Sequence, residues 1–166
     1  PCVSAIGELV QHFGVTAVLC TATQPALGRL FKQLAPTLVQ HEIAPDPDEL
    51  FDCFRRVSFC REGVFTPEKL AERLTETAQV LCIVNTRKRA RQVYESLPEE
   101  GRFHLSTLMI PTDREKTLNA IRTRLQNGKT CRVVSTSLVE AGVDVDFPSV
   151  WRELAGLDSI LQAAGR

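Results

Sequence analysis

The sequence lacks several features that would assign it at once to a class of protein. It has no excess of charge of one sign, because lysine plus arginine and aspartate plus glutamate each number 20. This balance excludes a uniformly basic nucleic-acid-binding protein, but it allows a local basic face. The longest apolar runs are about as long as a strand, and no signal peptide is visible. We therefore expect a cytoplasmic protein with no membrane partner.

The residue spacings of a metal site or a disulfide framework are also missing. The six cysteines form no Cys-x-x-Cys pair, and Cys20, Cys82 and Cys131 lie inside apolar runs. The three histidines have no partner at metal-ligand spacing. We therefore expect reduced cysteines in the core, and no metal site.

The order of hydrophobic patterns predicts an α/β protein. The sequence predicts strands at residues 16–22, 55–60, 80–85, 103–107, 131–136 and 149–154, and the runs at 16–22 and 80–85 are of the buried type. Amphipathic patterns predict helices at residues 3–13, 25–34, 67–77, 87–97 and 112–126. Strands that alternate with helices favour a parallel sheet with right-handed crossovers.

Local signals predict where some of these helices begin and end. Thr66 is placed to cap the helix that starts at Pro67. Thr112 and Glu115 fit a capping box at the start of the next long helix, and Asn127-Gly128 fits its end. Residues 35–52 are rich in proline and acidic residues, so this stretch predicts a linker.

Three predicted strands end in small hydroxyl or amide side chains. The strings are CTAT at 20–23, VNTR at 84–87 and VSTS at 134–137. Such side chains, beside free backbone N–H groups, suit phosphate oxygens. Any one of them could be a plain helix cap. Three at the carboxyl edge of one parallel sheet favour a ligand-binding edge.

Four strings in the sequence resemble successive motifs of superfamily 2 helicases, most closely the helicase-nuclease of type I CRISPR interference. They are TATQP at 21–25, IVNTRKRA at 83–90, STSLVEAGVDVDFP at 135–148 and QAAGR at 162–166. The last two together are the most specific. The resemblance implies a RecA-like, P-loop NTPase-type parallel sheet with helices on both faces. Residues 1–40 would end the first RecA-like lobe, 41–53 would be a linker, and 54–166 would form a second lobe truncated at its end.

The resemblance also implies a function for a longer polypeptide. That polypeptide would be an ATP-dependent helicase that translocates on single-stranded DNA in CRISPR interference, with the CRISPR surveillance complex as a partner. ATP and Mg²⁺ would be bound mainly by the first lobe, whose GxxxxGK[ST] loop and Asp-Glu-x-His box are absent from this sequence. Both ends look cut, so we expect this chain alone to be inactive in ATP hydrolysis.

The resemblance and the strand-end chemistry together assign candidate nucleic-acid contacts. These are Asn85, Thr86, Arg87, Ser106, Ser135 and Thr136. Thr86 and Arg87 begin a basic helix that also carries Lys88, Arg89 and Arg91, in a protein that is otherwise neutral. This cluster fits a groove that follows a nucleic-acid backbone, although it could also be a solvated helix face.

A second set of candidates belongs to the cleft where ATP would lie between the lobes. Glu140, Gly142, Asp144 and Gly165 would line the cleft, with Asp144 holding the ribose or orienting an arginine; a plain turn cap is its alternative role.

The resemblance also assigns catalytic and coupling residues. Arg166 would reach the γ-phosphate, and Gln162 would sense or polarise the same site. Thr21 and Thr23 would couple the nucleotide state to the grip on the strand.

Two other functions stay open at this point. One is an RNA helicase of the same superfamily; glutamine at 162 weakly favours DNA. The other is a non-catalytic α/β docking module that kept the fold and lost the motor. A small-molecule α/β enzyme is less favoured because no set of nucleophile, base and orienting residue is visible.

Overall fold

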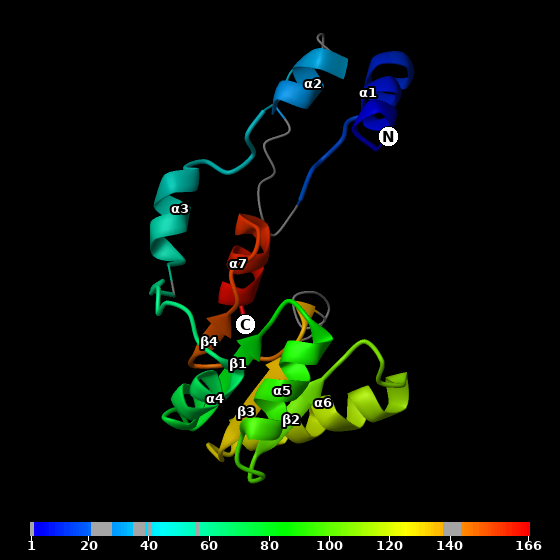
Figure 1. Cartoon of the computed structure of the whole chain (residues 1–166). Helices are drawn as coiled ribbons and strands as arrows, with labels where there is room; N and C mark the ends of the chain where they lie inside the picture. Colours follow the sequence, from blue (N-terminus) through cyan, green and yellow to red (C-terminus); the bar gives the residue numbers. More distant parts are fainter. Residues whose placement is uncertain (1, 21–27, 35–38, 40, 56, 138–143) are drawn as a thin grey trace. The chain divides into compact units, whose positions relative to one another are not determined.

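The computed structural model describes residues 2–20, 28–34, 39, 41–55, 57–137 and 144–166 (Figure 1). The chain divides into two compact units, Pro1–Ser58 and Phe59–Arg166. The stretch predicted as a linker lies inside the first unit. The assignment of the chain to two helicase lobes stays a prediction.

The first unit contains short helices. They are α1 (Cys2–Phe13), α2 (Gly28–Leu34) and α3 (Pro47–Cys53). The helices predicted at 3–13 and 25–34 are confirmed where the structure describes them, and α1 packs against α2. The predicted linker contains α3, whose start is fixed by Asp46: its carboxylate accepts a hydrogen bond from the Glu49 N–H at 3.1 Å.

Two predicted strands in the first half of the chain are wrong. Residues 16–20, and residues 55 and 57–60, are described and form no strand. Val18 and Phe59 are well exposed instead. A strand needs a hydrogen-bonded neighbour, and none of the described segments pairs with these runs. An apolar run shows that a segment prefers burial, but it does not supply the partner.

The second unit alternates helices and strands. Its elements are α4 (Pro67–Thr75), β1 (Gln79–Ile83), α5 (Arg87–Ser96), β2 (Arg102–Leu105), α6 (Pro111–Gln126), β3 (Cys131–Ser135), β4 (Val150–Arg152) and α7 (Leu157–Ala164). Every strand and helix predicted between residues 67 and 154 is confirmed, with small shifts of the ends. The sequence reading did not predict α7.

The strands of the second unit form a parallel sheet in the order β2-β3-β1-β4. The chain moves from β1 to β2 through α5, then returns to β3 through α6. These two crossovers run in opposite directions, so right-handed connections place α5 and α6 on opposite faces. The predicted α/β fold with helices on both faces is confirmed (Figure 1).

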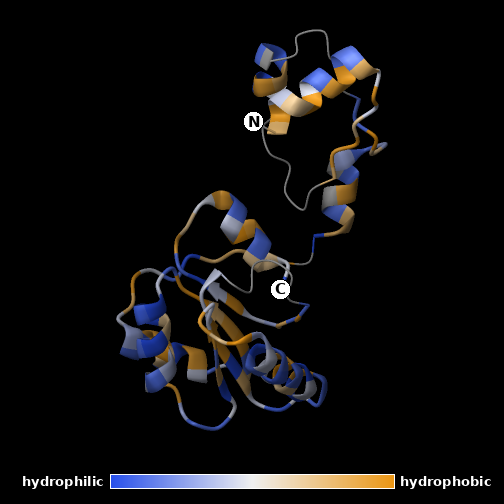
Figure 2. Cartoon of the chain, turned by 90° about the vertical axis from the view of Figure 1, so that its right-hand side faces the viewer, coloured by the Kyte–Doolittle hydropathy of each residue, from blue (hydrophilic) through white to orange (hydrophobic). Residues whose placement is uncertain are grey.

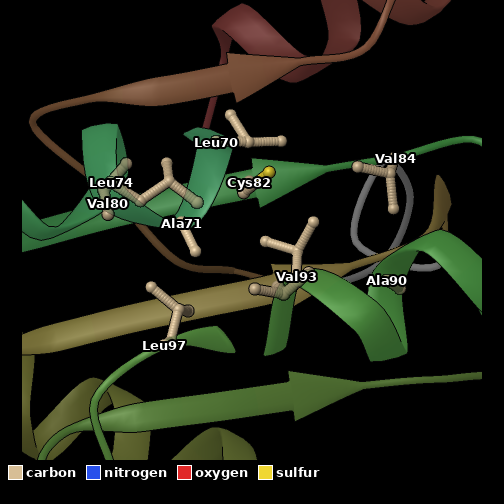
Figure 3. Packing of buried hydrophobic residues seen from close by; sticks show 10 residues of the cluster. Leu70, Ala71, Leu74, Val80, Cys82, Val84, Ala90, Val93 and Leu97 are labelled. Atoms are coloured by element: carbon tan, nitrogen blue, oxygen red, sulfur yellow. The ribbon is translucent and has the colours of Figure 1, made fainter. Parts of the chain in front are cut away.

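Each face of the sheet carries its own apolar cluster. The cluster under α4 and α5 consists of Leu70, Ala71, Leu74, Val80, Cys82, Val84, Ala90, Val93, Leu97 and Val134 (Figure 3). The cluster under α6 and α7 consists of Leu81, Ile83, Leu105, Ile121, Cys131, Val133, Val145, Phe147 and Ala163. Alternate residues of β1 enter alternate clusters, as the period of a strand requires. Figure 2 shows the apolar strands between helices whose outer sides are hydrophilic.

The caps of the helices agree with the sequence in two of three cases. Thr66 caps α4 as predicted: its hydroxyl accepts a hydrogen bond from the Lys69 N–H at 3.4 Å. The end of α6 at Asn127 is also confirmed. The capping box at Thr112 is wrong, because α6 begins at Pro111, with Ile110 as a cap that makes no side-chain hydrogen bond. A proline favours the first helical position, and it moves the start one residue earlier.

All six cysteines are free, and only two of them are buried. Cys82 and Cys131 lie in the core as predicted. The predicted burial of Cys20 is wrong, since it is exposed together with Cys2, Cys53 and Cys60. Burial raises the pKa of the Cys82 thiol to about 12, with the Glu153 carboxylate adding to the shift. Burial also raises the pKa of Cys131 to about 11.

This difference predicts selective thiol labelling of the folded chain. At pH 8 a thiol with a pKa of about 12 is ionised at about one part in 10⁴, and its sulfur is also shielded. Iodoacetamide should therefore modify the four exposed cysteines in native buffer and all six in guanidinium chloride, as counted by mass spectrometry. Rapid native labelling of Cys82 or Cys131 would contradict this core.

Candidate functional site

The carboxyl ends of β1 and β3 lie side by side. Ile83 is in register with Ser135, and the Val84 N–H donates to the Ser135 carbonyl oxygen at 2.9 Å. The residues that follow, 85–87 and Thr136, therefore start from the same edge of the sheet. The sequence predicted that three strand ends would meet here. The structure brings two of them together, while Thr21 and Thr23 lie outside the described residues.

The connections that leave these two strands depart toward opposite faces. The path from β1 enters α5, which covers one apolar cluster. The path from β3 returns through Val145 and Phe147, which belong to the other cluster. In open parallel sheets, ligands bind in the crevice where neighbouring connections diverge in this way. Residues 138–143 of this connection, including Glu140 and Gly142, lie outside the described residues.

The start of α5 presents a cap and a cation at this edge. The Thr86 hydroxyl accepts a hydrogen bond from the Arg89 N–H at 3.2 Å, so it is the N-cap of the helix. Arg87 follows as the first helical residue, is exposed, and has no ion pair within the described part of the chain. By contrast, Arg91 pairs with Glu95 one turn further along, at 2.7 Å. Arg87 is thus the better placed cation for an external phosphate.

The Asn85 side chain is engaged at both ends of its amide. Its Nδ2 donates to the Leu154 carbonyl oxygen at 2.9 Å, and its Oδ1 accepts from Arg152 at 2.6 Å. The Asn85 backbone N–H donates to Glu153 Oε2 at 2.6 Å. These bonds tie the end of β1 to the end of β4. The predicted phosphate contact of Asn85 is untested, and the geometry gives this side chain a positioning role.

Glu153 is a site residue that sequence reasoning missed. Besides the Asn85 N–H, its carboxylate pairs with Arg89 Nη1 at 3.1 Å. Arg89 also donates to the Phe65 carbonyl oxygen at 2.9 Å. The one available signal was an acidic residue near the end of the strand predicted at 149–154, and its partners could not be identified until β1 and β4 were known to be neighbours.

Three other predicted phosphate ligands, Ser106, Ser135 and Thr136, have buried side chains. Ser135 is fully buried, and its hydroxyl donates toward the carbonyl oxygens of Leu105 and Thr136 at 3.2 and 2.9 Å. Ser106 is buried too, and its hydroxyl accepts from the Leu108 N–H at 3.3 Å. The Ser135 hydroxyl joins the ends of β2 and β3, and the Ser106 hydroxyl stabilises the turn that follows β2. Contact with nucleic acid stays a prediction for all three.

The closing helix α7 contains Gln162, and Gly165 and Arg166 follow its last residue. Gly165 caps its carboxyl end, and Gln162 and Arg166 are both partly exposed there. Ala163 belongs to the same apolar cluster as Val145 and Phe147. The structure thus anchors α7 in the same cluster as the segment that follows Asp144. Asp144 is exposed, and its carbonyl oxygen accepts from Arg122 Nε at 3.1 Å.

A hollow of about 440 Å³ opens beside the start of α5. It is lined by Phe65, Thr66, Pro67, Glu68, Thr86, Lys88, Arg89 and Gln92. These residues come from the beginnings of α4 and α5, so two helix amino termini and two cations border it.

Over the ranges that the structure describes, no three histidine, cysteine or carboxylate side chains gather as a metal site would require. In the same ranges, no helix has the length and apolar content to cross a membrane.

Comparison with known proteins agrees with the predicted resemblance. The family model described as CRISPR-associated nuclease/helicase Cas3, C-terminal, matches residues 76–166. The protein named CRISPR-associated nuclease/helicase Cas3 from Methanothermobacter thermautotrophicus is 28% identical over 171 residues, covering 96% of this chain and 21% of its own length. Its namesake from Haloferax volcanii is 56% identical over 34 residues, 20% of this chain and 4% of that protein.

Two solved structures share the fold. The crystal structure of T. fusca Cas3-ATP superposes with a TM-score of 0.52 and 24% identity, over 64% of this chain and 14% of that one. The T. fusca Cas3-AMPPNP structure gives a TM-score of 0.50 and 24% identity, over 63% and 14%. The predicted fold, that of a RecA-like helicase lobe, is confirmed. The chain spans about a fifth of the length of the M. thermautotrophicus relative.

Proposed function

The chain belongs to the CRISPR-associated nuclease/helicase Cas3 C-terminal family, and from this we propose that it is the second motor lobe of an ATP-dependent helicase that translocates on single-stranded DNA. The proposal includes action in CRISPR interference, in the cytoplasm, with the CRISPR surveillance complex as a partner. The observation that supports it is the sheet edge where β1 and β3 end in register, with Thr86 and Arg87 following β1 and Thr136 following β3.

This edge suits a nucleic-acid backbone. Helix α5 directs its amino terminus there, which favours negative charge, and Arg87 adds a cation that no described residue pairs with. Thr136 follows the neighbouring strand β3, and its side chain is buried. Asn85 and Ser135 fix these groups by their internal bonds. The chain is neutral overall, so attraction for phosphate would be local to this edge.

The nucleotide would be bound near the carboxyl end of α7. The two similar T. fusca structures are of Cas3-ATP and Cas3-AMPPNP, which supports a nucleotide site in this family. Arg166 suits the transferred phosphate because its guanidinium is always charged and can contact two oxygens. Gln162, Gly165 and Asp144 would border the same cleft.

Other parts of the proposed cycle lie on residues that the structure does not describe or in the first lobe. Glu140 and Gly142 would complete the cleft, and Thr21 and Thr23 would couple the lobes. Mg²⁺ and most of the nucleotide would be held by the first lobe. When bound ATP draws the lobes together, Arg166 would approach the γ-phosphate. After hydrolysis the lobes would separate, and the phosphate contacts at 86–87 would advance along the strand.

ATP hydrolysis by a polypeptide that also carries the first helicase lobe tests this function. It should be measured without nucleic acid, with single-stranded DNA and with single-stranded RNA. Stimulation by DNA supports the proposal. Stimulation by RNA alone would transfer the assignment to an RNA helicase, and hydrolysis under none of the conditions would favour the docking module.

The same sheet edge predicts a specific loss on substitution of Arg87. Arg87→Ala should weaken single-stranded DNA binding about fivefold and lower the slope of log affinity against log salt by about 0.7, the value for one phosphate contact. Fluorescence anisotropy with an oligothymidylate at several salt concentrations measures both. Arg91→Ala is the matched control, because Arg91 is on the same helix and already pairs with Glu95. Equal effects of the two substitutions would mean that the whole helix face binds diffusely.

A further inference from the structure

The short segment 152–154 holds the beginning of the β1–α5 connection from one side. The Glu153 N–H donates to the Ile83 carbonyl oxygen at 2.8 Å, which extends the pairing of β4 with β1. Arg152 and the Leu154 carbonyl oxygen bind the two ends of the Asn85 amide. The loop that precedes Thr86 therefore has its position set by the end of β4.

Glu153 is the centre of this arrangement. One carboxylate oxygen accepts the Asn85 N–H at 2.6 Å, and the other pairs with Arg89 at 3.1 Å. Its side chain is 26% exposed, so these bonds are partly shielded from water. The two partners flank Thr86 and Arg87 in sequence. One carboxylate thus fixes both sides of the proposed DNA contact.

The Glu153 carboxylate is the counter-ion of the partly buried Arg89 guanidinium. The Arg89 side chain is 35% exposed, and its Nε is buried with no hydrogen-bond partner within the described ranges. Loss of the carboxylate would leave this guanidinium with the Phe65 carbonyl oxygen as its remaining hydrogen-bond acceptor. A partly buried guanidinium without its counter-ion is unfavourable, so the first turn of α5 would rearrange.

The same segment leads directly into α7. Helix α7 begins at Leu157, three residues after Leu154, and it ends at the residues proposed for the nucleotide cleft. We propose that Glu153 is a positioning residue that transmits movement of α7 to the DNA contact at Thr86 and Arg87. This inference rests on the proposed function, since it links the proposed nucleotide and DNA sites. It assigns Glu153 no contact with either ligand.

The coupling between nucleotide binding and DNA binding distinguishes a positioning role of Glu153 from a merely structural one, because a structural role would leave this coupling unchanged. If movement of α7 reaches residues 86–87, a bound nucleotide changes the affinity for DNA, and the ratio of the two affinities measures the coupling. Anisotropy titrations with an oligothymidylate, with and without AMPPNP, give this ratio for the polypeptide that carries both lobes. Thermal unfolding of each variant sets a temperature at which all are folded.

Glu153→Ala should lower DNA affinity in the AMPPNP state about tenfold, as expected for loss of a charge-assisted contact, and should bring the affinity ratio close to one. Glu153→Gln should recover part of the ratio, because its amide oxygen can still accept the Asn85 N–H. Glu95→Ala, which removes another carboxylate–arginine pair involving α5, should leave the ratio unchanged. Arg87→Ala should lower both affinities and keep their ratio.

Two results would overturn the inference while leaving the proposed function intact. One is a wild-type ratio of one in a protein whose ATP hydrolysis is stimulated by DNA. The other is a normal ratio in Glu153→Ala. Failure of the wild-type protein to bind DNA at all would instead refute the proposed function.

Discussion

Arg166→Ala is expected to lower DNA-stimulated ATP hydrolysis by about 10³-fold in a polypeptide that carries both helicase lobes, the lower end of the range for arginines that stabilise phosphoryl transfer. The physical reason is the charge that develops on the phosphate oxygens, which a guanidinium can neutralise from the opposing lobe. Arg166 follows the cap of α7, and its N–H donates to the Ala163 carbonyl oxygen at 3.2 Å, so the helix fixes its backbone beside the proposed nucleotide site. Steady-state release of inorganic phosphate at saturating DNA measures the effect.

Two further variants test the specificity of that result. Arg166→Lys keeps the charge but loses the planar fork, so it should recover only a small part of the rate. Lys116→Ala removes an exposed cation of α6 and should leave the rate within about twofold. Normal hydrolysis by Arg166→Ala would exclude Arg166 from the nucleotide site, and α7 would then have a structural role alone.

Gly101→Ala is expected to destabilise the chain far more than an ordinary glycine substitution. Gly101 has a φ of +70°, and an added Cβ would lie 2.3 Å from the Thr130 carbonyl oxygen. The left-handed conformation costs an alanine about 1–2 kcal/mol, and forced displacement of packed backbone adds about 1–3 kcal/mol. The free energy of unfolding should therefore fall by about 2–5 kcal/mol in sum.

Gly128 supplies a matched control for this prediction. Its φ is +64°, but no atom lies within 4 Å of the position that a Cβ would take. Gly128→Ala should therefore cost about 1–2 kcal/mol, the conformational part alone. Urea unfolding followed by circular dichroism compares the two variants. Equal losses in the free energy of unfolding would show that the backbone around Gly101 and Thr130 can move apart to admit a Cβ at no cost.

The second unit was predictable because its signals are local. The central strands β1 and β3 are largely apolar runs of strand length, and α4 has its own cap, Thr66. The first unit was less predictable, because the run at 16–20 depends on a neighbour that no local pattern supplies. α7 was missed since its eight residues follow a glycine without a side-chain cap.

The candidate site shows the same limit. Motif resemblance located the loop at 85–87 and the closing residues at 162–166. It did not reveal that the Asn85 side-chain amide is hydrogen-bonded to Arg152 and to the Leu154 carbonyl oxygen, or that Glu153 pairs with Arg89. Those contacts join residues more than 60 positions apart, and they depend on the strand order. Site residues that act through others are visible only after the topology is known.

The position of β1 in the sheet has a consequence for synthesis of the chain on the ribosome. β1 pairs with β3, which follows about 50 residues later, and with β4 beyond it. At about 5–20 residues per second, several seconds pass before the first of these partners exists. During that interval the nascent chain carries an unpaired VLCIV segment, a feature that promotes aggregation. Helices α4 and α5 flank β1 in sequence and cover one side of it, so they can shield this segment before the sheet is complete.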